Sequence, residues 1–441
     1  MGGSVPEIPG TKAEGDELHH LRRDVAQLLG RDRPNFPGAQ PVSFARRHLF
    51  ELQKENYFVC EKSDGIRCLM WQTKMQTPSG PQEYIFLIDR KNDYYHVPAL
   101  HFPLPEDELN FHIATLVDGE LVNDRQPDGS LQLKYLVFDC LVLDGGRLMH
   151  RTLDKRLAYF REKVFNPYKA LYKKYPDELE YVPFIVEFKE MEFSYGIEKM
   201  FRDILPNLPH GNDGLIFTCV TSPYKFGTDE HILKWKTANE NSIDFLLMLQ
   251  WPMLNPDSED EAEGITEPYP DYLAMPTFNL RVMQDKGQYL NYGTMHVEPH
   301  EWEVMKRLEE PLDDRIIECY MDEQGRWRYL RFRDDKLDAN HISTVRSVRE
   351  SIEDRVSEMD LIANAKKVRD EWKKRQAVEE ARQKQEAAAR AAAQAMRPSP
   401  AVNGQNGVGR DASSGTKRKL EDGQADGGEK RRLTPLSGAS S

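Results

Sequence analysis

The chain has 441 residues, a formal net charge of −13, 39% hydrophobic residues and 30% charged residues. This length predicts two or three domains, and the composition is typical of a globular protein with polar segments. No apolar run reaches the roughly 18 residues of a membrane-spanning helix, and the acidic balance argues against tight nonspecific binding of nucleic acid.

The N-terminal part is expected to change from disorder to helix near residue 16. Residues 1–15 are rich in Gly, Pro and charge and are predicted to be disordered. From Asp16 to Leu29 the apolar residues recur at helical spacing, which predicts an amphipathic helix that ends at Gly30.

Short apolar runs separated by turns follow from Tyr57 to about Phe245, with helical stretches between them. They predict an α+β domain over residues 16–245 in which sheets pack on sheets or helices. A small β-barrel is expected over residues 246–345, with an exposed acidic insertion near 253–270.

The last hundred residues are expected to add a helical extension and a tail. Residues 346–396 have helix propensity with few core residues, and residues 397–441 are rich in Gly, Ser, Pro and charge. We therefore predict a helical extension followed by a disordered tail.

The octapeptide EKSDGIRC, residues 61–68, follows one apolar strand and precedes another. Its Asp-Gly pair predicts a turn directly after Lys62, so this lysine lies at the end of a strand. A lysine there can be an amine nucleophile when its surroundings favour the neutral form. A hydrated surface lysine beside a hairpin turn is the alternative interpretation of these eight residues alone.

Other charged residues are spaced so that they share a face of a strand. In ILKWK, Lys234 and Lys236 alternate, which suits the oxygens of a triphosphate. Carboxylates at Glu120 and Asp213 lie near predicted strand ends, where they can hold a divalent metal or accept hydrogen bonds from sugar hydroxyls. An exposed strand face and ordinary turn chemistry are the respective alternatives.

The segment WRYLRFRDDK, residues 327–336, crowds charged side chains into one strand and the turn after it. Arg331 and Arg333 share a face of the strand, where two guanidinium groups can bind phosphates bidentately. Asp335 and Lys336 complete an R-x-D-K pattern. A solvated charged strand is the alternative.

In this order, these segments resemble the motifs of the covalent nucleotidyltransferases, which include mRNA capping enzymes and polynucleotide ligases. The motif K-x-D-G-x-R contains Lys62, and the resemblance runs from about Gln40 to Asn340. The later blocks are VDGELV, YLVFDCL, NDGLIFT, ILKWK and WRYLRFRDDK.

The resemblance implies a nucleotidyltransferase domain of antiparallel sheets with flanking helices, an OB-fold barrel that closes over it, and roles for individual residues. Lys62 is implied as the nucleophile that carries GMP. Glu120 is implied at the ribose and Phe138 as the aromatic that stacks on the purine. The remaining nucleotide-binding positions are implied to be Arg67, Arg90, Asp213, Lys234, Lys236, Asp244, Arg331, Arg333, Asp335 and Lys336.

Several segments are similar to capping enzymes, especially the fungal kind, rather than to ligases: the R-x-D-K ending, PGAQPVSF and LIDRKNDYY. The implied activity is mRNA guanylyltransfer from GTP to the 5′-diphosphate end of RNA, with Mg²⁺ or Mn²⁺ and a metal contact at Asp213. An ATP-dependent polynucleotide ligase and a non-catalytic scaffold of the capping machinery are the alternative functions.

The resemblance also implies partners and a location. No H-C-x-x-G-x-x-R phosphatase loop precedes Gln40, so we expect a separate RNA 5′-triphosphatase subunit in a heteromer. The phosphorylated C-terminal domain of RNA polymerase II is a further expected partner, and no membrane is expected. Basic clusters at 417–419 and 430–432 have the spacing of a bipartite nuclear-import signal, and basic clusters that only solubilise the tail are the alternative.

Overall fold

The computed structural model describes residues 5–78, 80–237, 240–308 and 310–395. Within these ranges no helix is both long and apolar enough to cross a membrane. Contacts group the chain into one unit that ends at Ala381 and a second that begins at Arg382. The functional residues considered below all belong to the first unit.

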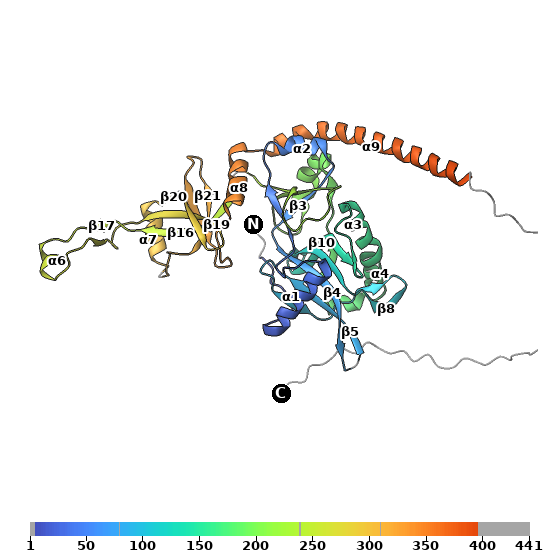
Figure 1. Cartoon of the computed structure of the whole chain (residues 1–441), viewed down its shortest axis with the longest axis horizontal. Helices are drawn as coiled ribbons and strands as arrows, with labels where there is room; N and C mark the ends of the chain where they lie inside the picture. Colours follow the sequence, from blue (N-terminus) through green and yellow to red (C-terminus); the bar gives the residue numbers. More distant parts are fainter. Residues whose placement is uncertain (1–4, 79, 238–239, 309, 396–441) are drawn as a thin grey trace, which may run out of the picture. The chain divides into compact units, whose positions relative to one another are not determined.

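An eight-stranded sheet forms the centre of the N-terminal part (Figure 1). Its strand order is β1-β6-β5-β4-β9-β10-β11, with β12 paired to β10. The strands are β1 (Thr11–Lys12), β4 (Ile66–Thr77), β5 (Gly80–Ile88), β6 (Tyr94–Val97), β9 (Thr115–Arg125), β10 (Leu131–Leu143), β11 (Gly146–Arg147) and β12 (Ile185–Phe188). All pairings are antiparallel except that of β10 with β12.

A second sheet has five strands in the order β13-β3-β14-β15-β2. They are β2 (Ala39–Ser43), β3 (Tyr57–Ser63), β13 (Glu192–Phe193), β14 (Asn212–Cys219) and β15 (Gly227–Trp235). The edge strand β2 runs parallel to β15, so the predicted antiparallel sheets each contain one parallel pairing. A small separate hairpin consists of β7 (Pro103–Leu104) and β8 (Asp107–Phe111).

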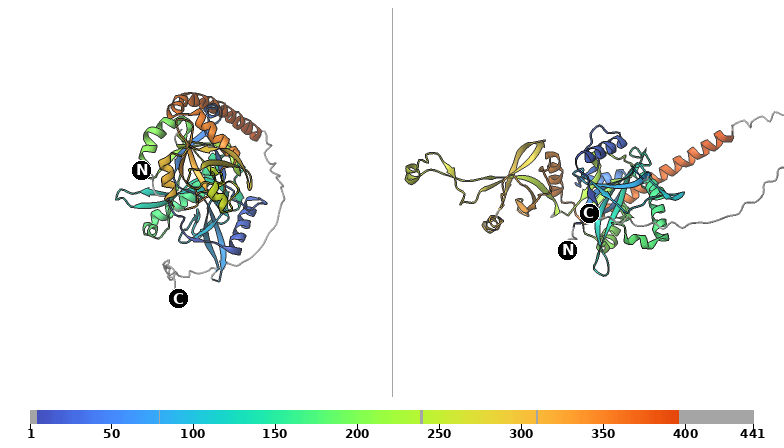
Figure 2. Two further views of the ribbon diagram at one scale, coloured as in Figure 1. Left: turned by 90° about the vertical axis from the view of Figure 1, so that its left-hand side faces the viewer. Right: turned by 90° about the horizontal axis from the view of Figure 1, so that it is seen from below.

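Helices bury both faces of the eight-stranded sheet (Figure 2). On one face lies α1 (Gly15–Leu29), whose Leu21, Val25 and Leu29 are buried, as the apolar spacing predicts. On the other lie α3 (Leu153–Phe160), the π-helix η1 (Arg161–Phe165) and α4 (Asn166–Lys174), which pack Phe160, Val164, Tyr168 and Tyr172 against the strands. These are among the helical stretches that the sequence predicts between the apolar runs.

Shorter helices complete the N-terminal part. They are α2 (His48–Lys54), η2 (Pro176–Glu180), η3 (Ser194–Gly196), α5 (Ile197–Lys199), η4 (Met200–Ile204) and η5 (Leu205–Asn207). On α2, the side chain of Leu52 is 2% exposed because it packs into the core of the five-stranded sheet, which also contains Val59, Phe217 and Leu233.

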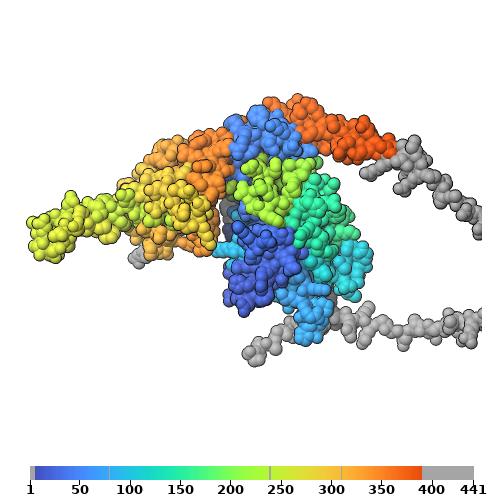
Figure 3. Space-filling view, in the orientation of Figure 1, coloured from blue at the N-terminus to red at the C-terminus, as the bar shows by residue number. Residues whose placement is uncertain are grey.

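A closed five-stranded barrel in the order β16-β19-β20-β22-β21 follows. Its elements are β16 (Ser242–Gln250), β19 (Thr277–Asp285), β20 (Gln288–Met295), α7 (Pro299–Lys306), β21 (Ile316–Met321) and β22 (Trp327–Phe332). Between β16 and β19 an arm carries β17 (Met253–Leu254), α6 (Ser258–Ala262) and β18 (Tyr269–Pro270). In the space-filling view this arm stands clear of the barrel strands, in agreement with the expected acidic insertion (Figure 3).

Two helices follow the barrel, α8 (Ile342–Asp354) and α9 (Glu358–Ala395). The indole Nε1 of Trp235 donates to the carbonyl oxygen of Val356 between them, over 2.8 Å. The first turns of α9 bury Leu361 and Val368, whereas the side chains described beyond about residue 376 are mostly exposed. This agrees with the predicted helical extension.

Two predictions differ from the structure. Residues 1–15 were expected to be disordered, but Thr11 and Lys12 form β1, because their extended backbone adds to the edge strand β6. The boundary expected after residue 245 falls inside β16, which begins at Ser242. The predicted tail over 397–441, with both basic clusters, lies outside the described residues.

Candidate active site

Lys62 lies where the chain passes from the five-stranded sheet to the eight-stranded sheet. It is the penultimate residue of β3, and the turn at Asp64 and Gly65 leads directly into β4. A Cβ atom at Gly65 would lie 2.2 Å from the carbonyl oxygen of Leu121, so only glycine allows this turn to approach β9 so closely. The turn predicted after Lys62 is confirmed.

Asp213 holds the side chain of Lys62 and that of a second lysine. The Nζ atom of Lys62 is 2.6 Å from Oδ1 of Asp213, and the Nζ atom of Lys236 is 2.6 Å from its Oδ2. Burial alone would raise the pKa of Asp213, but the two ammonium groups outweigh it and hold this pKa below its usual range. The three side chains remain 21–28% exposed, so a phosphate can reach them.

Lys234 lies beside this trio without a carboxylate partner in any described ion pair. Burial, together with the positive charges of Lys236, Lys62 and Arg90, lowers its pKa to about 8. A lysine in such surroundings gains more than an exposed one from an incoming anion, because the anion offsets both the lost hydration and the repulsion.

The eight-stranded sheet supplies the opposite wall. Arg67 of β4 binds Asp118 with Nε and Nη2 at 2.9 and 2.6 Å, and the hydroxyl of Tyr224 donates to the same carboxylate over 2.6 Å. Burial works against the charge of Arg67, but Asp118 outweighs it and raises the pKa of the guanidinium. Arg67 pairs across the strands with Glu120 of β9, so the two backbones are adjacent.

Phe138 and Arg90 lie close to this pair. Phe138 is half-buried at an irregularity of β10 between Val137 and Asp139, and its ring centre is 5.5 Å from the guanidinium carbon of Arg67. Such an irregularity interrupts the regular alternation of side chains between the two faces of a sheet, so that the side chain points in a different direction. Burial lowers the pKa of Arg90, and the charge of Arg67 lowers it further.

A buried lysine that the sequence analysis did not select connects the two walls. The Nζ atom of Lys189 donates to the hydroxyl of Ser63 over 2.6 Å and lies 3.3 Å from Glu61 and 3.5 Å from Glu120. Its pKa is raised because these carboxylates outweigh its burial. The only local signal was one lysine directly after the apolar strand β12.

His210 extends this network on the far side of Glu61. Its Nδ1 lies 2.7 Å from Asp124 and its Nε2 lies 3.6 Å from Glu61. Burial lowers the pKa of His210, but the hydrogen bond to Asp124 and the negative charge of Glu61 outweigh burial and raise it to about 9. The imidazolium therefore balances the charges of two buried carboxylates, one of which, Glu61, directly precedes Lys62 in β3.

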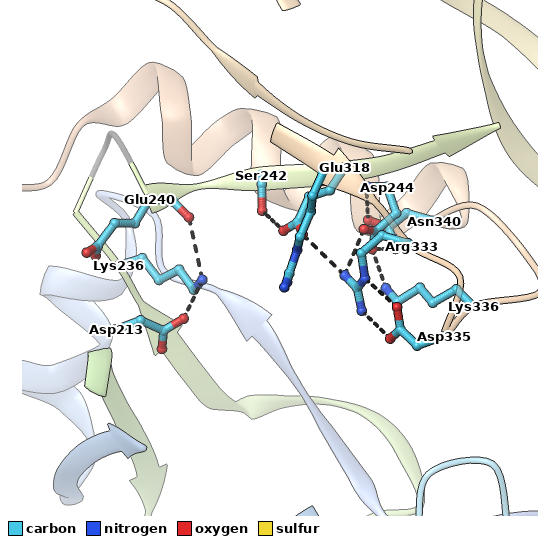
Figure 4. A network of polar contacts seen from close by, with 11 residues as sticks. Asp213, Lys236, Glu240, Ser242, Asp244, Glu318, Arg333, Asp335, Lys336 and Asn340 are labelled. Carbon is cyan, nitrogen blue, oxygen red and sulfur yellow. Dashed lines mark hydrogen bonds and ion pairs between the residues drawn. The ribbon is translucent and has the colours of Figure 1, made fainter. Parts of the chain in front are cut away.

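The barrel contributes a second charged cluster (Figure 4). Arg333 donates to Asp244 over 2.9 Å and binds Asp335 with two nitrogens, at 2.8 and 2.7 Å. Lys336 also pairs with Asp244. Hydrogen bonding to Arg333 lowers the pKa of Asp335 to about 2, so this carboxylate stays ionised at neutral pH.

Glu318 is a further residue that sequence reasoning missed. It lies 2.7 Å from Arg331 and 3.5 Å from Arg333, and it accepts from Ser242. A single glutamate inside the apolar strand β21 was the only signal for it. Among the three barrel cations that line the cavity, Arg331 has the most exposed side chain, at 63%, against 16% for Arg333 and 33% for Lys336.

One cavity of about 1450 Å³ brings most of the selected residues together. The selected residues that line it are Lys62, Arg67, Arg90, Glu120, Asp213, Lys234, Lys236, Asp244, Arg331, Arg333, Asp335 and Lys336. Phe138 is not among the lining residues, but its ring lies next to Arg67, which does line the cavity. The cations that line the cavity outnumber the carboxylates that line it, which suits a polyanionic ligand such as a nucleoside triphosphate.

The carboxylates of the site can be compared with what the expected Mg²⁺ or Mn²⁺ ion requires. Among the described residues, no three or more His, Cys, Asp or Glu side chains are grouped as a metal cage. A lone carboxylate such as Asp213 still fits Mg²⁺, which proteins commonly bind through one or two carboxylates together with substrate phosphates.

Comparison with known protein families gives the same assignment along nearly the whole folded chain. The profile of the mRNA capping enzyme catalytic domain matches residues 4–238, and that of the mRNA capping enzyme C-terminal domain matches residues 240–362. The chain belongs to the mRNA capping enzyme family. The boundary between the two matches falls just before β16, the first strand of the barrel.

Individual relatives agree with this membership. The mRNA-capping enzyme subunit alpha of Neurospora crassa is 47% identical over 84% of this chain and 95% of its own length. That of Schizosaccharomyces pombe is 46% identical over 83% of this chain and 88% of its own length. The structure of a Chlorella virus DNA ligase-adenylate is 13% identical and covers 68% of this chain. Its TM-score of 0.29 is too low to support a conclusion about this chain.

Proposed function

We propose that this chain is an mRNA guanylyltransferase that binds GMP covalently to Lys62 and transfers it to the 5′-diphosphate end of RNA. The observation that carries the proposal is the position of Lys62: its amine faces the cation-lined cavity and contacts Asp213, in a chain of the mRNA capping enzyme family. Family membership favours this activity over the ligase and scaffold alternatives.

In the first step the neutral amine of Lys62 attacks the α-phosphorus of GTP. A nitrogen–phosphorus bond forms, the bond from the α-phosphorus to the bridging oxygen breaks and its electron pair leaves with pyrophosphate, while the attacking nitrogen releases a proton to water. Catalysis of such a transfer is mostly positioning and charge stabilisation. Lys234 and Lys236 adjoin the attacking nitrogen and suit the charge that develops on the phosphates.

The other wall suits the nucleoside. Glu120 and Arg90 line the cavity and are proposed to bind the ribose, while Arg67 adjoins the nucleotide. Phe138 is proposed to stack on the guanine, which requires its ring to turn into the cavity. Its half-exposed position at a strand irregularity leaves room for that movement.

We further propose that the barrel is an OB-fold lid. Its strand order, with a helix between the third and fourth strands, supports this assignment. Closure would bring Arg331, Arg333 and Lys336 to the β- and γ-phosphates, and opening would release pyrophosphate and admit RNA. Arg333 and Lys336 are paired with Asp244 here, so incoming phosphates would replace or share these contacts.

The proposed metal ion is Mg²⁺ or Mn²⁺, held by Asp213 together with the phosphates of GTP. When bound, such an ion supplies charge neutralisation at the phosphates. Asp213 would then release one or both of its lysines, because its two oxygens already contact Lys62 and Lys236.

Partners and location follow from the family and are also proposals. Relatives carry the name subunit alpha, which supports an assembly with at least one further subunit. We propose that this subunit is a separate RNA 5′-triphosphatase, and that the phosphorylated C-terminal domain of RNA polymerase II is a second partner. We also propose a nuclear location, because capping acts on transcripts as they emerge from the polymerase.

A chase experiment tests the assignment. The protein is incubated with GTP or ATP labelled at the α-phosphate, and the labelled protein is then mixed with 5′-diphosphate RNA or with nicked DNA. We expect an acid-labile, base-stable adduct from GTP whose label moves only to the RNA. Labelling by ATP with sealing of the nick would instead establish the ligase activity, and no label from either nucleotide would favour the scaffold.

A further inference from the structure

The cavity around Lys62 is larger than one nucleotide requires. Its volume of about 1450 Å³ exceeds the roughly 300–1,000 Å³ of ordinary small-molecule pockets. Beyond the residues that face the nucleotide and the barrel cluster, a further part of its wall comes from β2, α2, the first half of β15 and α8. We call this part the β2–α2 wing; it includes Val42, Arg47, Phe50, Lys54, His231 and Thr344.

The wing has an exposed aromatic ring between two cations. Arg47, Phe50 and Lys54 are spaced three and four residues apart, so they form one stripe along α2. The buried Leu52 fixes the orientation of this helix from its opposite side. Phe50 is nevertheless 64% exposed, although aromatic rings usually contribute most when buried.

The wing carries a few separate cations, with carboxylates between them, rather than a continuous positive surface. Arg47 pairs with Glu350 of α8, while Lys54 forms no ion pair with any residue that the structure describes. Glu51 and Glu230 also line the cavity. A polyanion in the wing would therefore meet only a few cations, and stacking on Phe50 would supply much of its binding. This combination of a stacking platform with scattered cations is typical of sites for single-stranded nucleic acid.

The chemistry of the second step sets the direction from which an acceptor arrives. A terminal β-phosphate oxygen of the RNA attacks the α-phosphorus of Lys62–GMP, and the nitrogen–phosphorus bond breaks. Its electron pair returns to Nζ, which takes up a proton. In an in-line displacement the acceptor enters opposite the leaving nitrogen, from the side that pyrophosphate vacated.

The wing begins next to that side. Lys234, which faces the proposed phosphates, pairs across the strands with Ser43 of β2. An RNA strand that leaves the phosphate site in this direction crosses β2 and reaches α2 and α8, which all line the cavity. The amide of Ser43 in β2 donates a hydrogen bond to the hydroxyl of Ser347 in α8 over 3.1 Å, which joins β2 to α8.

We propose that the β2–α2 wing binds the first nucleotides of the acceptor RNA as a single strand, with a base stacked on Phe50 and backbone phosphates at Arg47 and Lys54. This inference rests on the proposed guanylyltransferase function. The proposed RNA surface takes no part in adduct formation. Measuring adduct formation and transfer to RNA separately therefore tests the RNA site independently of the guanylyltransferase function.

The test uses the full chain with Phe50→Ala or Lys54→Glu, with Leu109→Ala and Lys155→Glu as controls. The control residues are exposed and do not line the cavity. For each protein, the rate of GMP-adduct formation is measured without RNA. Transfer from the isolated adduct is then measured to a 5′-diphosphate oligoribonucleotide and to adenosine 5′-diphosphate, which has no second nucleotide.

We expect adduct formation to be unchanged in all four variants. Phe50→Ala should raise the KM for the oligonucleotide roughly fivefold or more, the loss expected for one base–aromatic stack, and Lys54→Glu should raise it and reduce its salt dependence. Transfer to adenosine diphosphate should be unaffected. Unchanged oligonucleotide transfer in both variants, or an equal loss with adenosine diphosphate, would overturn the proposal. Absence of any adduct in the unmodified protein would instead refute the proposed function.

Discussion

Lys62 donates a hydrogen bond from Nζ to Oδ1 of Asp213 over 2.6 Å, while the other oxygen of the same carboxylate holds Lys236. One carboxylate thus sets the positions of the proposed nucleophile and of a second lysine that is proposed to bind phosphate. The three groups are held together before any nucleotide arrives, and the first prediction removes the charge of the carboxylate.

Replacement of Asp213 by Asn should slow adduct formation by roughly 10²-fold or more, the typical cost of removing one preorganised charged group at a reacting centre. Both lysines lose their counter-charge, so their positions relax and their repulsion grows. The measurement is the single-turnover rate of labelling by GTP. The exposed Asp203 provides the matched control, Asp203→Asn, and equal rates for the two variants would contradict the role of Asp213.

Lys234 predicts a dependence of nucleotide affinity on pH. Its pKa of about 8 means that it is charged below pH 8 and increasingly neutral above it, so phosphate binding should weaken as the pH rises. We expect the Kd of α,β-methylene GTP, which cannot transfer GMP, to rise roughly tenfold between pH 7 and pH 9. Lys234→Arg, whose charge does not titrate in this range, should bind with little change. Parallel pH profiles for both proteins would refute the prediction.

Arg333 should be irreplaceable by lysine. It makes two hydrogen bonds to Asp335 and one to Asp244, a fork that a single ammonium group does not reproduce. We expect both Arg333→Ala and Arg333→Lys to reduce the rate of adduct formation by roughly 10²-fold. Arg349→Lys, on the adjacent α8 and away from the cavity wall, is the control. Normal labelling by Arg333→Lys would show that charge alone is sufficient.

His210 predicts a pH-dependent contribution to stability. Its pKa of about 9 in the folded chain is above the ordinary 6.5, so its contribution is fully present below pH 6.5 and is lost as the pH rises through 9. The two values correspond to about 3 kcal/mol as an upper estimate. In His210→Gln, the free energy of unfolding in urea should be lower at pH 6.5 and should approach that of the unmodified protein near pH 10. An equal deficit at both pH values would contradict this.

The sequence predicted the local parts of the site well. The turn after Lys62 depends on an Asp-Gly pair and its flanking strands, all within a few residues, and the alternation of ILKWK aims Lys234 and Lys236 at one cavity. Apolar spacing likewise located α1 to within one residue of its start. Short-range chemistry is sufficient for features of this kind.

Contacts between distant segments escaped prediction. Lys189 meets Glu61 and Glu120 only after both sheets have formed, and no spacing in the chain indicates that meeting. Tyr224 reaches Asp118 in the same way. For β1, composition indicated disorder, whereas pairing with the distant strand β6 decides its structure. Such features follow from tertiary packing.

Labelling by GTP followed by peptide mapping shows which lysine carries the nucleotide. The unmodified protein, Lys62→Ala and the control Lys155→Ala are incubated with each of the four ribonucleoside triphosphates labelled at the α-phosphate, and labelled peptides are sequenced by mass spectrometry. We expect one GMP adduct on Lys62, formed from GTP alone, equal in the control and absent from Lys62→Ala. An adduct that persists in Lys62→Ala, or that maps to Lys234 or Lys236, would contradict it.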